Sequence, residues 1–184
     1  MHAKPNNACS PWNRLIPALA ASAFIACGCG GINPARIAPK AVTPASPRIP
    51  VSVRVMDVTG GKKSTFGGAE MINNDQFRQS LLLALQQGAL FNEVSKERGD
   101  VDLFAVIRSE GQRTSRGLQY TATMVVTYRF VDRASNVVWS SSYDSEFSST
   151  AFSGAARTLN AREGAARENL TAFLKGVKEQ YPRK

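Results

Sequence analysis

Residues 120–130 read YTATMVVTYRF, and this stretch decides the fold. Apolar or aromatic side chains occupy every second position, and the positions between them are mostly threonine, with an arginine near the end. A period of two places alternate side chains on opposite faces of a β-strand. The apolar face consists of Tyr120, Ala122, Met124, Val126, Tyr128 and Phe130. The stretch therefore predicts a strand in a sheet that has one dry face and one wet face.

The segment that follows predicts a partner for this strand. Turn-forming residues at 132–136 lead into a second segment with Val137, Trp139, Tyr143 and Phe147 on one face. The positions between them are rich in serine. The two segments together predict a long antiparallel hairpin whose apolar faces lie on the same side.

Two further strands are expected before the hairpin. Residues 51–58 (VSVRVMDV) alternate valine with mostly polar residues. Val101, Leu103, Ala105 and Ile107 alternate in the same way. Each pattern predicts a strand that is buried on one face.

Two amphipathic helices complete the expected domain. The side chain of Asn73 or Asn74 can cap the first helix, and Gly88 suits its C-terminal exit. Its apolar face is formed by Phe77, Leu81, Ala84 and Leu85. Asn160 with Glu163 predicts a capping box that opens the last helix. The apolar side of that helix carries Ala166, Leu170, Phe173, Leu174 and Val177.

The expected element order is β-α-β-β-β-α over residues 51–184. Two helices with one apolar face each, and strands with one apolar face, predict an α+β fold arranged as a two-layer sandwich. The expected sheet has four strands, is mainly antiparallel and carries both helices on one face. We expect residues 51–184 to form a single domain.

The N-terminal segment has the pattern of an export signal. Residues 1–14 are polar and carry Lys4 and Arg14, and residues 15–26 read LIPALAASAFIA. This apolar run has signal-peptide length and is too short to span a bilayer. We therefore expect residues 1–26 to be a signal peptide.

The sequence FIAC at residues 24–27 resembles the lipobox of bacterial lipoproteins, with Phe24 where leucine is usual. The resemblance implies that Cys27 receives a diacylglyceryl group and that the mature protein carries fatty acyl chains such as palmitate. Cys29 is the alternative acceptor. Gly28, rather than aspartate, follows Cys27, and this implies sorting to the periplasmic face of the outer membrane. The alternative is a plain cleaved signal that releases the protein into the periplasm.

Residues 27–50 follow the expected lipidation site and contain five prolines among small and polar residues. This composition predicts a flexible, lipid-anchored tether before the folded domain. Fully extended, residues 28–50 would reach about 70 Å.

The charge and the histidine and cysteine content of the chain limit which kinds of site it can contain. Five cations and no acids in residues 1–50 account for much of the net charge of +9, so the domain carries a mild excess and no nucleic-acid partner is expected. The only histidine is His2, which excludes histidine-based triads and metal sites in the mature chain. The cysteines lie near the anchor, and a Cys27–Cys29 metal site would lack further ligands. We expect no cofactor and no metal.

The remaining candidates for chemistry are weak. Two carboxylate pairs at strand spacing, Asp100 with Asp102 and Asp144 with Glu146, could serve acid–base catalysis, although solvated acids are the simpler interpretation. The aromatic side chains of the hairpin could line a lipid groove or form the buried face of the sheet. Arginines 108, 113 and 116 could meet lipid phosphates or form a solvated loop. The glycine-rich segment 59–68 lacks the Walker spacing and predicts a turn.

Several motifs resemble a largely uncharacterised group of small proteobacterial envelope lipoproteins. They are VTGGKKS after the first strand, NNDQFRQSLLLAL on the first helix, GLQYTATMVVTYRFVD on the third strand and AREGAARENLTAFL on the last helix. The architecture is also similar to the lipopolysaccharide-assembly lipoprotein and to auxiliary lipoproteins of ABC lipid transporters. The aromatic-rich strand that follows the lipid cysteine in the assembly lipoprotein is missing here.

The anchor, the resemblance and the lack of catalytic residue types predict a non-enzymatic accessory protein of envelope assembly or lipid transport. It would be attached to the membrane and would bind an envelope protein or a lipid. The alternatives are a lipid- or glycan-handling enzyme that uses carboxylates only, and a secreted binding protein without lipid. The sequence leaves the oligomeric state and the identity of the partner open.

Overall fold

The computed structural model describes residues 31–40, 47–62, 71–114 and 118–181. Residues 1–30, which include the expected signal peptide and Cys27, lie outside the described residues. The elements, in chain order, are α1 (Pro34–Ile37), β1 (Ile49–Val55), α2 (Asn74–Gly88), β2 (Phe91–Ser95), β3 (Val101–Thr114), β4 (Tyr120–Asp132), β5 (Val137–Ser149) and α3 (Gly154–Gln180).

The strands form one five-stranded sheet in the order β2-β1-β3-β4-β5. Strand β1 is parallel to both of its neighbours, whereas β3, β4 and β5 are antiparallel to one another. The α+β class is confirmed, but the expected four-stranded, mainly antiparallel sheet is wrong. The missing strand, β2, has only five residues, and their alternation is too short to be distinguished from a loop.

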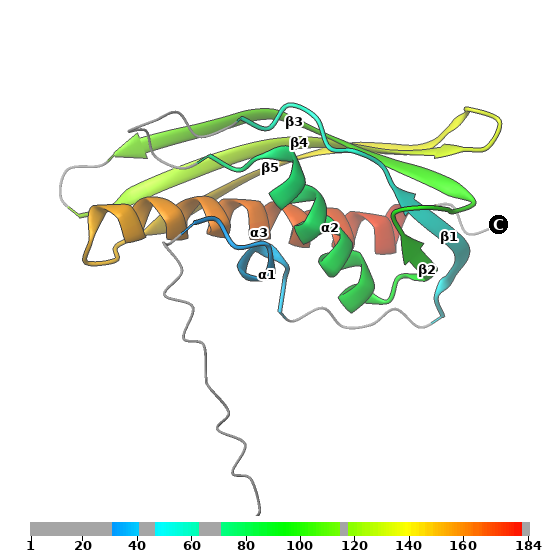
Figure 1. Cartoon of the computed structure of the whole chain (residues 1–184), viewed down its shortest axis with the longest axis horizontal. Helices are drawn as coiled ribbons and strands as arrows, with labels where there is room; N and C mark the ends of the chain where they lie inside the picture. Colours follow the sequence, from blue (N-terminus) through cyan, green and yellow to red (C-terminus); the bar gives the residue numbers. More distant parts are fainter. Residues whose placement is uncertain (1–30, 41–46, 63–70, 115–117, 182–184) are drawn as a thin grey trace, which may run out of the picture.

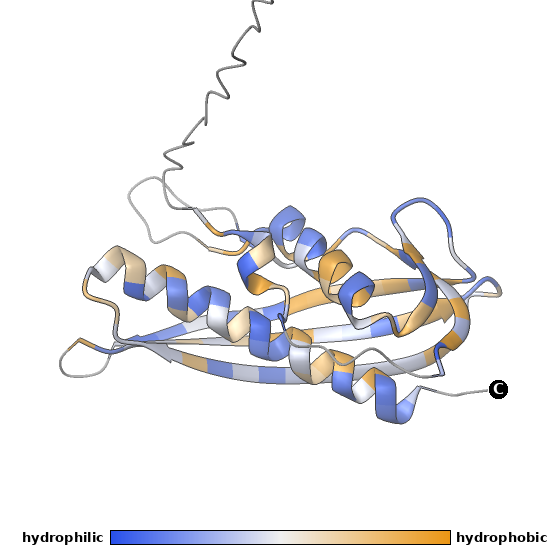
Figure 2. Cartoon of the chain, turned by 90° about the horizontal axis from the view of Figure 1, so that it is seen from below, coloured by the Kyte–Doolittle hydropathy of each residue, from blue (hydrophilic) through white to orange (hydrophobic). Residues whose placement is uncertain are grey.

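Helices α2 and α3 cover one face of the sheet, and α1 lies against them on the side away from the strands (Figure 1). Polar and apolar residues alternate along the strands and helices (Figure 2). The aromatic rings of Tyr128 and Phe173 stack between β4 and α3 with their centroids 4.0 Å apart. The core therefore lies between the sheet and the two long helices.

The hairpin that was expected from residues 120–149 is confirmed. Ala122, Met124, Val126, Tyr128 and Phe130 are at most 1% exposed. The prediction that Val137 lies on the buried face is wrong, because its side chain is 54% exposed. The register shifts between Phe130 and Val131, so the alternation of β5 towards the helices begins only at Trp139.

The helix boundaries agree only in part with the sequence. Asn73 caps α2 in a capping box with Gln76, as one of the two expected caps. The left-handed residue at the end of α2 is Ala89, with φ 45°, rather than Gly88. Helix α3 begins at Gly154 with Ser153 as its N-cap, so the expected capping box of Asn160 and Glu163 is wrong.

The predicted flexible tether is replaced by packed structure in its described part. The side chain of Asn33 caps α1 by accepting a hydrogen bond from the Ala35 N–H at 3.0 Å. Ile37 is fully buried, and Ile32 is 6% exposed. Strand β1 begins at Ile49, inside the segment assigned to the tether. The folded unit thus includes Ile32 and Ile37, because their apolar side chains add to the core.

Candidate functional site

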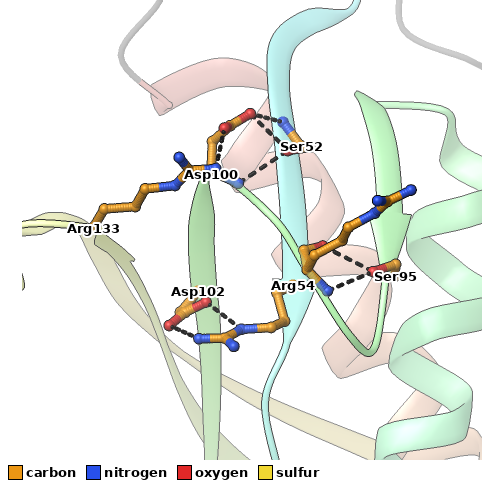
Figure 3. Close-up of polar contacts among 7 residues, drawn as sticks. Ser52, Arg54, Ser95, Asp100, Asp102 and Arg133 are labelled. Carbon is orange, nitrogen blue, oxygen red and sulfur yellow. Dashed lines mark hydrogen bonds and ion pairs between the residues drawn. The ribbon is translucent and has the colours of Figure 1, made fainter.

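Asp100 and Asp102, the first carboxylate pair, lie where the chain crosses from β2 over β1 to β3 (Figure 3). The crossing is close: a Cβ on Gly99 would lie 2.3 Å from the main-chain nitrogen of Arg54. Only glycine fits this approach without a shift of the main chain. Asp100 therefore lies between a position that the fold restricts and the first residue of β3.

The carboxylate of Asp100 closes this crossing. It accepts hydrogen bonds from the Ser52 hydroxyl at 2.6 Å and from the Ser52 N–H at 3.1 Å (Figure 3). Arg133, in the β4–β5 turn, pairs with its other oxygen at 2.9 Å. The hydrogen bonds from Ser52, assisted by the positive charge of Arg133, lower the pKa of Asp100.

Asp102 has a different partner. Arg54 donates two hydrogen bonds to its two carboxylate oxygens, at 2.7 and 2.6 Å (Figure 3). The bidentate contact raises the pKa of the Arg54 guanidinium. Asp100 and Asp102 border a pocket of about 420 Å³ on the face of the sheet away from the helices. Each acid is bound to its own cation, and an acid with a lowered pKa is a poor proton donor at neutral pH.

The second carboxylate pair lies on the same face at the other edge of the sheet. Glu146 forms an ion pair with Arg113 at 2.5 Å, and both side chains are more than half exposed. Asp144 is exposed on the same strand. Arg108 donates to the Thr127 hydroxyl at 3.3 Å. Of the three arginines that could meet lipid phosphates, Arg113 pairs with Glu146 and Arg108 bonds to Thr127 instead. Arg116 lies outside the described residues.

The aromatic side chains of the hairpin form the buried face of the sheet rather than an open groove. Tyr128 and Phe130 are fully buried, and Trp139 is 8% exposed. The Tyr128 hydroxyl donates to Asn169 Oδ1 at 2.8 Å, and the Asn169 amide donates to the Tyr143 carbonyl at 2.7 Å. Burial raises the pKa of Tyr128 well above its usual value. These residues hold α3 on the sheet.

A buried ion pair between β3 and α3 was not found from the sequence. Arg162 Nη1 lies 3.6 Å from Glu110 Oε1, and the two side chains are 4% and 5% exposed. Arg162 also donates to Gln112 Oε1 at 2.8 Å. The Ile72 N–H donates to the other oxygen of Glu110 at 3.4 Å. Burial raises the pKa of Glu110, although Arg162 opposes the shift.

A β-bulge decides the position of Glu110. The register of β3 against β4 shifts between Ile107 and Ser109, where Arg108 is the extra residue. Without this shift, strict alternation after Ile107 would direct Glu110 to the outer face. The charge that interrupts the apolar alternation at 108–110 is the signal that could have indicated the bulge.

A second polar cluster joins α1 to α3 on the N-terminal side of the domain. Glu163, which is 2% exposed, accepts a hydrogen bond from the Asn33 N–H at 2.9 Å and pairs with Arg36 at 2.9 Å. Arg36 also donates to Asn160 Oδ1 at 2.6 Å. An open pocket of about 410 Å³ lies beside this cluster, and Arg36, Arg167 and the end of β5 line it. We call it the anchor-side pocket, because the chain leads from here towards Cys27.

The comparisons with known proteins give a likeness of fold. No protein-family model and no curated protein sequence matches the chain. A Xanthomonas campestris protein of the family DUF330 is 18% identical, with 78% of this chain and 95% of that one covered and a TM-score of 0.58. A hypothetical protein of Chlamydia trachomatis is 12% identical, with 71% and 98% covered and a TM-score of 0.52. A lipoprotein of Neisseria meningitidis is 14% identical, with 70% and 98% covered and a TM-score of 0.44.

At these identities the first two likenesses establish the α+β architecture and say nothing about a ligand or partner. The third score is too low to bear on the role of this chain. The expected similarity to the lipopolysaccharide-assembly lipoprotein is not shown by these likenesses. Function therefore has to be argued from the anchor and from the residues of the site.

Proposed function

We propose that this chain is a bacterial envelope lipoprotein, acylated at Cys27, whose folded domain is a non-enzymatic accessory module in envelope assembly or lipid transport. The acyl chains would attach it to the periplasmic face of the outer membrane. The domain would bind an envelope protein or a lipid there. Several acyl chains hold a protein on a bilayer far more firmly than one chain does.

The observation that carries the proposal is the short distance in sequence between Cys27 and the packed domain. Ile32 is already 6% exposed, and the Asn33 N–H is bonded to Glu163. Four residues separate Cys27 from Ile32, so the chain that joins these two residues spans at most about 18 Å. A lipid-modified Cys27 would thus hold the domain next to the bilayer rather than far from it.

The roles of the carboxylates support a binding function over carboxylate catalysis. Asp100 and Asp102 are each bound to a cation, and Glu146 is bound to Arg113. The hydrogen bonds from Ser52 lower the pKa of Asp100 and so favour its charged form. General acid–base work needs one group that takes up and gives back a proton near the operating pH.

The helices of the described residues are consistent with attachment through a lipid anchor. Within the described residues, none of the helices has the length and apolar character needed to span a bilayer. In the proposal, membrane attachment is therefore the task of the acyl chains at Cys27.

Metabolic labelling with an alkyne analogue of palmitate tests the anchor. Wild type and Cys29→Ala are expected to take up the label, and Cys27→Ala is expected to lose it. The two cysteines are two residues apart, so each variant is the control of the other. No label on the wild type, or equal label on Cys27→Ala, would contradict the proposal.

A complementation experiment tests the absence of carboxylate catalysis. A variant with Asp100→Asn, Asp102→Asn, Asp144→Asn and Glu146→Gln is expected to restore the phenotype of a deletion strain. Circular dichroism of the purified variant establishes that it is folded. A folded variant that does not complement would favour the enzyme over the accessory protein.

A further inference from the structure

One end of the domain presents large apolar side chains to solvent. Phe152 is 98% exposed and Leu118 is 64% exposed. The two lie at the same end of the sheet, because Tyr120 on β4 pairs with Ser149 on β5. We call Leu118 and the β5–α3 turn with Phe152 the apolar tip. Large apolar side chains that are exposed at one end of a domain can mark a contact surface.

The turn that carries Phe152 is held by hydrogen bonds. Arg157 donates to the carbonyls of Ala151 and Phe152, at 3.2 and 3.4 Å. The Ser153 side chain accepts from the Ala156 N–H at 3.1 Å and caps α3. The aromatic side chain is therefore displayed by an ordered turn.

Arg157 lies at the apolar tip, and Arg36 and Arg167 lie further along α3, where Glu163 pairs with Arg36. Arg157 is bonded to main-chain carbonyls, and the guanidinium of Arg167 lies 5.8 Å from the centroid of the Phe147 ring. Neither arginine forms an ion pair with a carboxylate among the described residues. Arg36 and Arg167 line the anchor-side pocket, which also borders Ala151 next to Phe152. Apolar side chains with cations around them match the interface of an anionic bilayer.

The length of the N-terminal chain allows the lipid to lie at the same end. Glu163, which binds Asn33, lies eleven residues beyond Phe152, or about 16 Å along the axis of α3. Six residues link Asn33 back to Cys27 and reach about 21 Å when extended. The chain is thus long enough for the lipidated cysteine to lie level with Phe152.

We propose that the apolar tip is a membrane-contact surface that inserts Leu118 and Phe152 into the phospholipid bilayer to which the chain is anchored. Arg157, at the tip, and Arg167, in the pocket that reaches Ala151, bind the phosphate groups of the lipids. The inference rests on the proposed lipid anchor, and it adds the orientation of the domain on the membrane. The opposite end of the hairpin, about 40 Å away along β4, then points away from the bilayer.

Photo-crosslinking in the full-length exported chain tests this orientation. Benzoylphenylalanine replaces Phe152 in one variant and Val137 in the other, in cells whose phospholipids carry radioactive phosphate. Val137 is the matched control, because it is 54% exposed and lies at the far end of the hairpin. Irradiation is expected to attach at least about fivefold more phospholipid at position 152 than at position 137.

Equal lipid attachment at the two positions overturns the inference, and so does attachment of a protein rather than lipid at position 152. Palmitate labelling of the same cells reports the anchor separately. Labelled protein without lipid attachment at position 152 overturns the orientation alone. Loss of the label overturns the proposed function, while lipid attachment at position 152 still decides the membrane contact.

The contribution of the arginines is tested in the position-152 variant. Arg167→Gln is expected to lower lipid attachment by about twofold or more, because each cation near an anionic surface adds to binding. Arg133→Gln is the control, since Arg133 is 77% exposed and lies in the β4–β5 turn next to Val137. An equal effect of both substitutions overturns the role of the arginines in binding lipid phosphate.

Discussion

Two of the arginine–carboxylate pairs that involve β3 differ in where they lie. Arg54 and Asp102 meet on the outer face with two bonds of 2.7 and 2.6 Å, and their side chains are 37% and 26% exposed. Arg162 and Glu110 meet between the sheet and α3 at 3.6 Å and are 4% and 5% exposed. The exposed pair has the shorter contacts between nitrogen and oxygen, and the side chains of the buried pair reach less solvent. Charges in water lose little when separated, whereas a buried charge that loses its partner is strongly penalised.

Arg162→Met is expected to cause the largest loss of stability, and so to show the difference between the buried and the exposed pair most clearly. It removes the nearest cation from the buried carboxylate of Glu110 and leaves only the weaker attraction of Lys62, so the free energy of unfolding should fall by about 3–5 kcal/mol. Denaturant titration followed by circular dichroism measures the loss. The double variant Arg162→Met with Glu110→Leu removes both charges and should regain most of the stability. A loss below about 1 kcal/mol in the single variant would contradict the burial of the pair.

The pH dependence of stability should have opposite signs for Glu110 and Asp100. Burial raises the pKa of Glu110, so its favourable contribution is present below the ordinary glutamate pKa and is lost as the pH rises through the native-state pKa. Hydrogen bonds from Ser52 lower the pKa of Asp100, so its contribution is present above the ordinary aspartate pKa and is lost as the pH falls.

Denaturant titrations of wild type, Glu110→Gln and Asp100→Asn across the acidic range measure both signs. The stability of the wild type relative to Glu110→Gln is expected to fall with rising pH. Its stability relative to Asp100→Asn is expected to rise with rising pH. Two differences with the same slope would refute the contrast between the buried and the exposed carboxylate.

Asp102→Asn should have the smallest effect. It breaks the bidentate contact with Arg54, but both side chains reach water and the remaining cation stays hydrated. The loss of unfolding free energy is expected to be about a quarter or less of that for Arg162→Met. Urea titrations at low and at high salt measure it, and salt should reduce the difference from wild type further. A loss as large as that for Arg162→Met would mean that the outer face is not open to solvent.

The parts of the fold that follow from local patterns could be predicted. The alternation over residues 120–130 gave β4, because side chains on a strand alternate whatever the strand pairs with. Asn73 was one of two expected caps of α2, because capping depends on residues within one turn. Strand β2 could not be predicted, since five residues become a strand only when β1 offers them hydrogen-bonding partners.

The site residues divide in the same way. Asp100 and Asp102 could be recognised as a pair on one face from their spacing. Their separate partners, Arg133 and Arg54, come from distant parts of the chain. Glu110 and Arg162 could not be paired, because a single extra residue in β3 determines which face Glu110 occupies. The acceptor role of Cys27 rests on sequence alone and stays a prediction.

The sequence by itself determined the α+β class and the buried face of the hairpin, and it predicts the lipid anchor, because each of these depends on neighbouring residues. Only the tertiary structure decided that part of the supposed tether binds α3 through Asn33 and Arg36 and buries Ile32. It also decided that Phe152 and Leu118 share one end of the sheet. The physical reason is that packing and strand register bring together residues that lie far apart in the sequence. Asn33 and Glu163 are 130 positions apart, and the paired residues Tyr120 and Ser149 are tens of positions apart. No local pattern records which of these surfaces meet.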